Sequence, residues 1–196
     1  MPQSAKSIRD SQRNKVLAQS IKQLSELYKL SETIVRNTDL NKVYKVALST
    51  IKKLLKVDKV SILLFDKDGV LKFKAWIGLS KNYRLAMKDH SHWGKDDKDL
   101  QPFLVPDVTQ NSSLSYSKKI LEDENIKSFA FFPLILKNSL IGKFVIYYKS
   151  PHIFSKAEVE FAQLVGRYIN FVINRRKVSE DFLNGIADGV TMQDAS

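Results

Sequence analysis

The sequence predicts an α+β fold: one antiparallel sheet of about five to six strands, with helices on one face and long helices at both ends of the chain. Three observations lead to this prediction. Apolar residues recur at helical spacing near both ends of the 196-residue chain. Short β-rich segments in the middle are paired by turn residues. A long irregular segment separates the two pairs, as expected for a loop that crosses one face of a sheet.

Two helices are predicted before the first strand. Between residues 14 and 36 the apolar residues recur at steps of three, four or seven, which is typical of an amphipathic helix with a heptad-like seam. Thr38 and Asp39 offer oxygens that can cap a second helix, whose broad apolar face runs from residue 40 to residue 55. The seam of the first helix consists of Leu17, Ile21, Leu24, Tyr28 and Val35.

The central segments predict two hairpins and one further strand. Asp66-Lys67-Asp68-Gly69 supplies the turn of the first hairpin and Asn138-Ser139 that of the second. Residues 78–102 are polar and irregular apart from a short helix predicted over residues 80–87, and another short helix is predicted over residues 115–124. The predicted strands are residues 57–65, 70–77, 103–108, 128–137 and 140–149.

A last long helix is predicted to begin at Ser155. Ser155 and Glu158 have the spacing of a capping box, and Phe154 with Val159 fits a hydrophobic staple. The helix has two neighbouring apolar stripes, more than packing on one sheet requires. We therefore expect a parallel homodimer through the seam of the first helix and one stripe of the last. The stripe expected in the dimer is Ala162, Val165, Ile169 and Val172; the second stripe is Phe161, Leu164, Tyr168 and Phe171.

Composition excludes several functions. The chain has no cysteine, which rules out disulfides, thiolate nucleophiles and thioether attachment of a chromophore. It has no apolar run long enough to span a membrane, so we expect a soluble, cytoplasmic protein without a membrane partner. The net charge of +11 suggests nucleic-acid binding, but the lysines are dispersed. Nucleic-acid binding is therefore kept only as a weaker alternative, and no nucleic-acid partner is predicted.

The search for reactive chemistry gives a negative prediction. The seven glycines form neither a dinucleotide fingerprint nor a P-loop, and no pair of carboxylates stands out as a general acid and base. His90 and His92 form a His-x-His pair near acidic residues, but a solvated polar cluster on a loop is the favoured interpretation. We predict that this chain is not an enzyme and that it needs no metal and no cofactor.

Three segments together carry a resemblance to a known family. Residues 102–108 read Pro-Phe-Leu-Val-Pro-Asp-Val, residues 132–148 form a hairpin with Gly142 inside it, and residues 154–164 open the last helix. The chain resembles a GAF domain over residues 24–176. The cyclic-nucleotide signature of some GAF domains, Asn-Lys-Phe-Asp-Glu, is missing.

The resemblance implies a sensory module of a larger bacterial-type signalling protein such as a sensor histidine kinase. Residues 1–23 are then a helical extension, and residues 177–196 are a linker followed by the start of a truncated segment. From Phe182 onward this tail resembles the first helix and strand of a PAS domain. A downstream signalling domain in the same chain is therefore expected.

Two functions from different classes remain open for such a module. In the first, a small-molecule ligand of unknown identity lies between the sheet and residues 78–102, and the terminal helices relay its binding. In the second, the domain is a ligand-free dimerisation spacer. Asp107 also fits an Asx-type turn, and Trp93 fits either a lid over the core or a pocket wall. The predicted ligand contacts are Trp76, Tyr83, Trp93, Leu104, Asp107 and Phe131.

Overall fold

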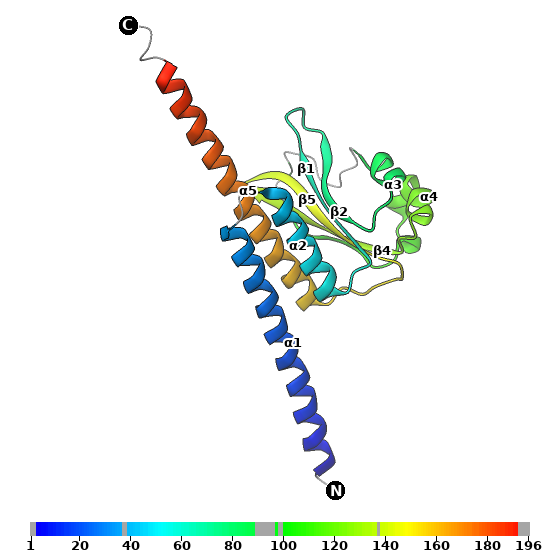
Figure 1. The fold of residues 1–196 in the computed structure, drawn as a ribbon. Coiled ribbons are helices and arrows are strands. Elements are labelled where there is room, and N and C mark those ends of the chain that lie inside the picture. Colours follow the sequence, from blue (N-terminus) through cyan, green and yellow to red (C-terminus); the bar gives the residue numbers. More distant parts are fainter. Residues whose placement is uncertain (1–2, 37–38, 89–96, 98–99, 137, 192–196) are drawn as a thin grey trace.

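The computed structural model describes residues 3–36, 39–88, 97, 100–136 and 138–191. One sheet of five strands lies at its centre, in the order β2-β1-β5-β4-β3, and all neighbouring strands are antiparallel (Figure 1). The predicted α+β class is thereby confirmed. In chain order the helices and strands are α1 (Gln3–Arg36), α2 (Leu40–Leu55), β1 (Lys59–Phe65), β2 (Leu71–Ile77), α3 (Lys81–Ala86), β3 (Phe103–Val105), the 3-10 turns Val108–Gln110 and Ser112–Ser117, α4 (Lys118–Asp123), β4 (Ser128–Leu136), β5 (Ser139–Tyr148) and α5 (Lys156–Thr191).

The start of α2 follows from its capping residue. The Asp39 side chain accepts a hydrogen bond of 2.9 Å from the amide of Asn41, which satisfies one of the free amides of the first turn. At the other end Lys56 adopts a left-handed conformation with a φ of 52°, which ends the helix. The cap expected from Asp39 is confirmed, whereas Thr38 lies outside the described residues.

The sheet has apolar residues on both faces, and each face has its own cover. The proximal face, as we call the side under the three long helices α1, α2 and α5, is centred on Ile62, Phe132 and Phe144. The distal face is the opposite side, where Tyr83 of α3 and Leu121 of α4 join residues of the sheet. The long helices therefore lie on one face, as predicted, and the short helices α3 and α4 cover the other (Figure 1).

The capping box predicted at the start of α5 is confirmed. The Ser155 hydroxyl accepts a hydrogen bond of 3.3 Å from the Glu158 amide, while a Glu158 carboxylate oxygen accepts one of 2.8 Å from the Ser155 amide. His152 extends this cap, because its Nε2 lies 3.0 Å from the other Glu158 carboxylate oxygen. The start of α5 is therefore specified by local sequence alone.

The prediction that the first apolar stripe of α5 forms the dimer interface is wrong. Its residues pack inside the proximal core, where none exceeds 3% exposure, because this stripe is the one that faces the sheet. Only part of the second stripe is exposed, since Leu164 is 36% and Phe171 57% exposed, whereas Phe161 is 7% exposed and packs in the proximal core. The buried stripe consists of Ala162, Val165, Ile169 and Val172.

The two terminal helices extend from opposite ends of the domain (Figure 1). α1 begins at Gln3, earlier than predicted, and residues 7–22 are exposed along its whole circumference. α5 continues without a break to Thr191, so residues 177–191 are helical where a linker was expected. Among the described residues, no helix is long and apolar enough to cross a membrane.

Candidate functional site

Alternation along β4 and β5 places a mixed set of side chains on the distal face. Successive strand residues point to opposite sides, so Phe129 and Phe131 of β4 share this face with Val145 and Tyr147 of β5. The rings of Phe129 and Phe131 stack with centroids 4.8 Å apart. The distal face is therefore an aromatic surface at the centre of the sheet.

Lys143 is a charged residue within this surface. It lies on β5, paired with Leu63 of β1 and Pro133 of β4, and is only 3% exposed. Its ammonium nitrogen is 4.1 Å from the centroid of the Phe131 ring, which is cation–π geometry. Burial lowers the pKa of Lys143 to about 7, since an ammonium ion loses its hydration there. A buried lysine whose ammonium packs on an aromatic ring is a candidate functional residue.

Two tyrosines place hydroxyl groups on the distal face, Tyr147 from β5 itself and Tyr83 from α3. The Tyr147 hydroxyl lies 3.0 Å from that of Ser61, and the Tyr83 ring meets the Tyr147 ring edge-on at 5.9 Å. Burial raises the pKa of Tyr147 to about 12, and it also raises the pKa of Tyr83 well above its ordinary value. Both side chains are therefore neutral hydrogen-bonding groups at physiological pH.

A buried ion pair joins three elements at one end of the distal face. The Lys59 ammonium contacts one Glu124 carboxylate oxygen and donates a hydrogen bond of 2.7 Å to the Glu124 carbonyl. The same carboxylate accepts bonds from the Ser80 amide, at 2.9 Å, and from the Ser80 hydroxyl. Burial tends to raise the pKa of Glu124, but the bonds from Lys59 and Ser80 outweigh it and hold the pKa below its usual value. This cluster fixes the start of α3 and the end of α4 against β1.

Trp76 lies on β2 at the margin of the distal face. Its side chain is 41% exposed, and the Arg84 guanidinium of α3 lies 3.8 Å from the ring centroid. The Arg84 Nε is buried without a hydrogen-bond partner, so the ring is its main described contact. The pair is a cationic and aromatic surface open to solvent.

The Asp107 side chain stabilises the start of the 3-10 turn Val108–Gln110. Its carboxylate accepts hydrogen bonds of 2.8 Å from the Thr109 amide and 2.7 Å from the Thr109 hydroxyl. These bonds, with the side-chain bond from Thr109 as the largest cause, lower the pKa of Asp107. The geometry is that of an Asx-type turn, one of the two interpretations that the sequence left open.

Three of the six predicted ligand contacts lie on the distal side, but Trp76 on the edge strand β2 is separated from Phe131 on β4 by β1 and β5. Trp76 and Tyr83 meet Arg84 and Tyr147 on the distal side, and Phe131 lies in the same apolar cluster as Tyr83. The prediction that Leu104 contacts a ligand on this side is wrong, because its side chain packs with the proximal core on the other side of β3. Trp93 lies outside the described residues.

Sequence reasoning missed Lys143, Tyr147 and Glu124. For Lys143 a signal existed, since its position in β5 has the same alternation phase as Val145 and Tyr147, which predicts an inward side chain. No local signal marks Glu124, whose partner Lys59 is 65 positions away. Among the described residues no group of three or more acidic or histidine side chains could hold a metal ion, and His90 and His92 are not among those residues.

The fold is an α+β domain in which the three long helices cover one face of an antiparallel sheet, while α3 and α4 cover the other face, which is rich in aromatic residues. A family profile described as GAF domain matches residues 39–173. The chain therefore belongs to the GAF family. This match lies inside the predicted range of residues 24–176, whose outer limits stay a prediction.

Solved structures agree with this assignment. A domain attributed to a two-component sensor histidine kinase of Sinorhizobium meliloti 1021 is 35% identical, with a TM-score of 0.66 over 71% of this chain and 94% of that one. The GAF domain of a phosphoenolpyruvate-protein phosphotransferase from Coxiella burnetii, at 16% identity, has a TM-score of 0.66 over 82% of this chain and 98% of its own. The GAF domain of the cyanobacteriochrome TePixJ, at 14% identity, has a TM-score of 0.65 over 74% and 95%. A search of curated proteins found no match.

Proposed function

We propose that this domain is a non-catalytic sensor that passes a signal between its terminal helices. The observation that carries the proposal is the arrangement of α1 and α5, which pack on the same face of the sheet and leave the domain at opposite ends (Figure 1). A tilt of one helix is therefore carried through the proximal core to the other. The 35% identical domain attributed to a two-component sensor histidine kinase supports a role in signalling. A cytoplasmic location and a downstream signalling domain stay predictions from the sequence.

The ligand proposed for this sensor lies on the distal face. Trp76, Tyr83 and Phe131 remain its expected contacts, and the described structure adds Lys143 beside Phe131. Trp93 and Asp107 stay predictions from the sequence. A weakly polar molecule suits the aromatic lining, and the ammonium form of Lys143 would stabilise one anionic group on it.

Replacing Phe131 with alanine is expected to weaken ligand binding without moving the terminal helices. A metabolite that binds the native state at a hundredfold excess over its Kd stabilises it by about 2.7 kcal/mol, which a thermal-shift screen detects. The ligand-induced shift of such a hit should shrink in Phe131→Ala and persist in Phe171→Ala, whose ring is exposed on α5. A hit with equal shifts in both variants, and also in Trp93→Ala, would place the site elsewhere.

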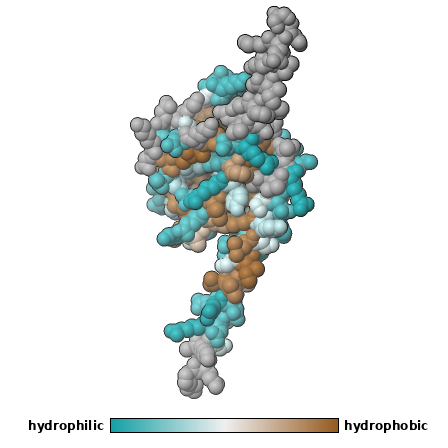
Figure 2. Space-filling model, turned by 90° about the vertical axis from the view of Figure 1, so that its left-hand side faces the viewer, coloured by the Kyte–Doolittle hydropathy of each residue, from teal (hydrophilic) through white to brown (hydrophobic). Residues whose placement is uncertain are grey.

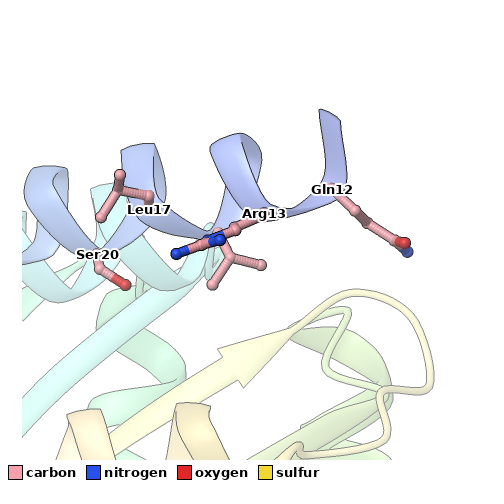
Figure 3. A pocket seen from close by; sticks show the side chains of 5 residues that line it. Gln12, Arg13, Leu17 and Ser20 are labelled. Carbon is pink, nitrogen blue, oxygen red and sulfur yellow. The ribbon is translucent and has the colours of Figure 1, made fainter. Parts of the chain in front are cut away.

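The exposed seam of α1 points to a second copy of this chain as partner. Leu17, Ile21, Leu24 and Tyr28 are each at least 57% exposed and follow the alternating four- and three-residue steps of a coiled coil. Figure 2 shows a group of hydrophobic residues, drawn in brown, on the projecting helix where it meets the body of the domain. In Figure 3, Gln12, Arg13, Leu17 and Ser20 line a pocket beside this helix, to which only α1 contributes. Parallel pairing of two α1 helices would bury the seam.

Leu24→Asp is expected to convert the dimer to a monomer, because two carboxylates would face each other in the seam. Sedimentation velocity at micromolar concentrations measures the change, and circular dichroism should show an unchanged fold. Gln19→Asp adds the same charge to the opposite side of α1 and should leave the dimer intact. Val165→Asp would not test the dimer, because Val165 is buried in the proximal core and its replacement would unfold the domain. A wild-type chain that is monomeric under these conditions contradicts the proposal.

A ligand-free spacer is the second candidate, and one observation favours it. The centre of the distal face is filled by the protein's own side chains, since Leu63, Val145 and Phe129 are each at most 2% exposed. Under this alternative the dimer remains, and the screen described above returns no hit that depends on Phe131.

A further inference from the structure

A cavity lies on the proximal side of the sheet, away from the proposed ligand face. It has a volume of about 260 Å³ and is bounded by β4, β5 and α5, together with one residue from the segment before β3. Its lining residues are Leu100, Phe132, Pro133, Ile135, Phe144, Gln163, Gly166, Arg167 and Asn170. Pockets that bind drug-sized ligands usually have volumes of about 300–1,000 Å³, so this cavity would hold a smaller molecule.

One wall of the cavity is polar and comes entirely from α5. Gln163, Arg167 and Asn170 follow each other at helical spacing, so they line the same side of the helix. The Asn170 Oδ1 is buried without a hydrogen-bond partner, which is costly for an amide oxygen. In the part of the chain that the structure describes, Arg167 forms no ion pair, and its residue is exposed at the rim. Among the described residues, this wall thus presents a buried acceptor without a hydrogen bond and a cation without an ion pair.

The floor of the cavity is apolar and rigid. The rings of Phe132 and Phe144 stack with centroids 4.7 Å apart and an angle of 9° between their planes. Gly166 lets α5 approach this floor, because a Cβ at that position would lie 3.0 Å from Cε1 of Phe144. β3 pairs with β4 only at residues 129–131, so Pro133 and Ile135 lie beyond the end of β3. The cavity is therefore next to a part of β4 that β3 does not cover.

We propose that this cavity is a second small-molecule site, which takes a compact carboxylate with an apolar ring and one neutral hydrogen-bond donor. The carboxylate pairs with Arg167, the donor bonds to the Asn170 Oδ1, and the ring packs against Phe132 and Phe144. The neutral donor is chosen because the Asn170 oxygen alone would not compensate a buried ammonium ion.

The site is independent of the distal ligand, from which the sheet separates it. Its polar wall lies on α5 between the core stripe and the exposed residues Leu164 and Phe171. A ligand bound in this cavity would fix the distance between α5 and β4. It would thereby also fix the position of the part of α5 that leaves the domain.

The probe for this proposal is 4-hydroxybenzoate, with benzoate lacking the donor and 4-hydroxybenzamide lacking the charge. Titration of the isotope-labelled chain, followed by nuclear magnetic resonance, should shift the amides of Gln163, Gly166 and Arg167 in a saturable way. Loss of one hydrogen bond to a charged group corresponds to about a tenfold weaker affinity. We expect that loss for 4-hydroxybenzamide and for Arg167→Gln, whereas Arg9→Gln on the exposed part of α1 should bind as the wild type does.

Asn170→Leu separates a ligand site from a merely structural role. Leucine has nearly the same shape as asparagine but removes the unpaired buried oxygen, so the melting temperature should rise while 4-hydroxybenzoate loses its hydrogen-bond acceptor and binds more weakly. The proposal is overturned if no saturable shift occurs at millimolar probe, or if Asn170→Leu leaves binding unchanged. It is also overturned if the shifts cluster at Tyr83 and Phe131, which would assign the carboxylate to the distal face.

Discussion

Replacing Gly142 with alanine is expected to lower the free energy of unfolding by about 3 to 5 kcal/mol, the upper end for a single substitution. A Cβ built on Gly142 would lie 2.1 Å from the carbonyl oxygen of Leu63 and 2.8 Å from the Cα of Leu64. Both are backbone atoms of β1, which pairs with β5 in the interior of the sheet, so no side-chain rotation relieves the contact. The two strands would have to separate.

Gly69→Ala is the matched control for this experiment. Gly69 has a φ of 77° in the β1–β2 turn, and its added Cβ would meet no atom within 4 Å. Only the backbone conformation is then unfavourable, at a cost of about 1 to 2 kcal/mol. Urea unfolding monitored by circular dichroism measures both variants. Equal losses of stability would show that β1 and β5 adjust to the extra carbon and that the close approach is unimportant.

Lys59→Met is expected to destabilise the domain by about 3 to 5 kcal/mol, because it leaves a buried carboxylate without its cation. The Glu124 side chain is 5% exposed and would retain only its bonds to Ser80. Lys53→Met is the matched control, since the Lys53 side chain is 55% exposed and Glu26, at 12% exposure, keeps its ion pair with Lys29. Such an exposed pair contributes about 0 to 1 kcal/mol, so the control should stay close to the wild type.

The pH dependence gives a second readout for the same pair. The pKa of Glu124 is lower in the folded state than its ordinary value of 4.5, so its stabilising contribution is present above pH 4.5 and is lost as the pH falls through the folded pKa. Without Lys59 that pKa should rise, because burial then acts with less opposition. The stability gap between the wild type and Lys59→Met should therefore be widest near neutral pH and narrow in acid. A gap that is constant from neutral to acidic pH would mean that packing, and not charge, accounts for the loss.

Much of the fold was predictable because local chemistry specifies it. The caps at Asp39 and at Ser155 with Glu158 formed as expected, because each joins groups within three positions of one another. The strand segments and the turn at Asp66 also agree with the structure, with shifts of a few residues at their ends. The family resemblance, carried by three segments, agrees with the profile match to residues 39–173.

The candidate site was predicted only in part, because periodicity shows which residues share a side and not what covers that side. Trp76, Tyr83 and Phe131 belong to the distal side, whereas Leu104 belongs to the proximal core. The same limit explains α5, where either of two apolar stripes could have faced the sheet and the one chosen for the dimer was the buried one.

The sequence by itself determined the helices and strands, their caps, the absence of cysteine chemistry and the family, since each of these follows from neighbouring residues or from composition. Only the tertiary structure decided that the Lys143 ammonium lies against the Phe131 ring, that Lys59 meets Glu124, and that Asn170 lines a cavity with an unpaired oxygen. The reason is physical: burial and charge pairing depend on segments far apart in the chain, and a side chain's environment exists only once those segments have packed.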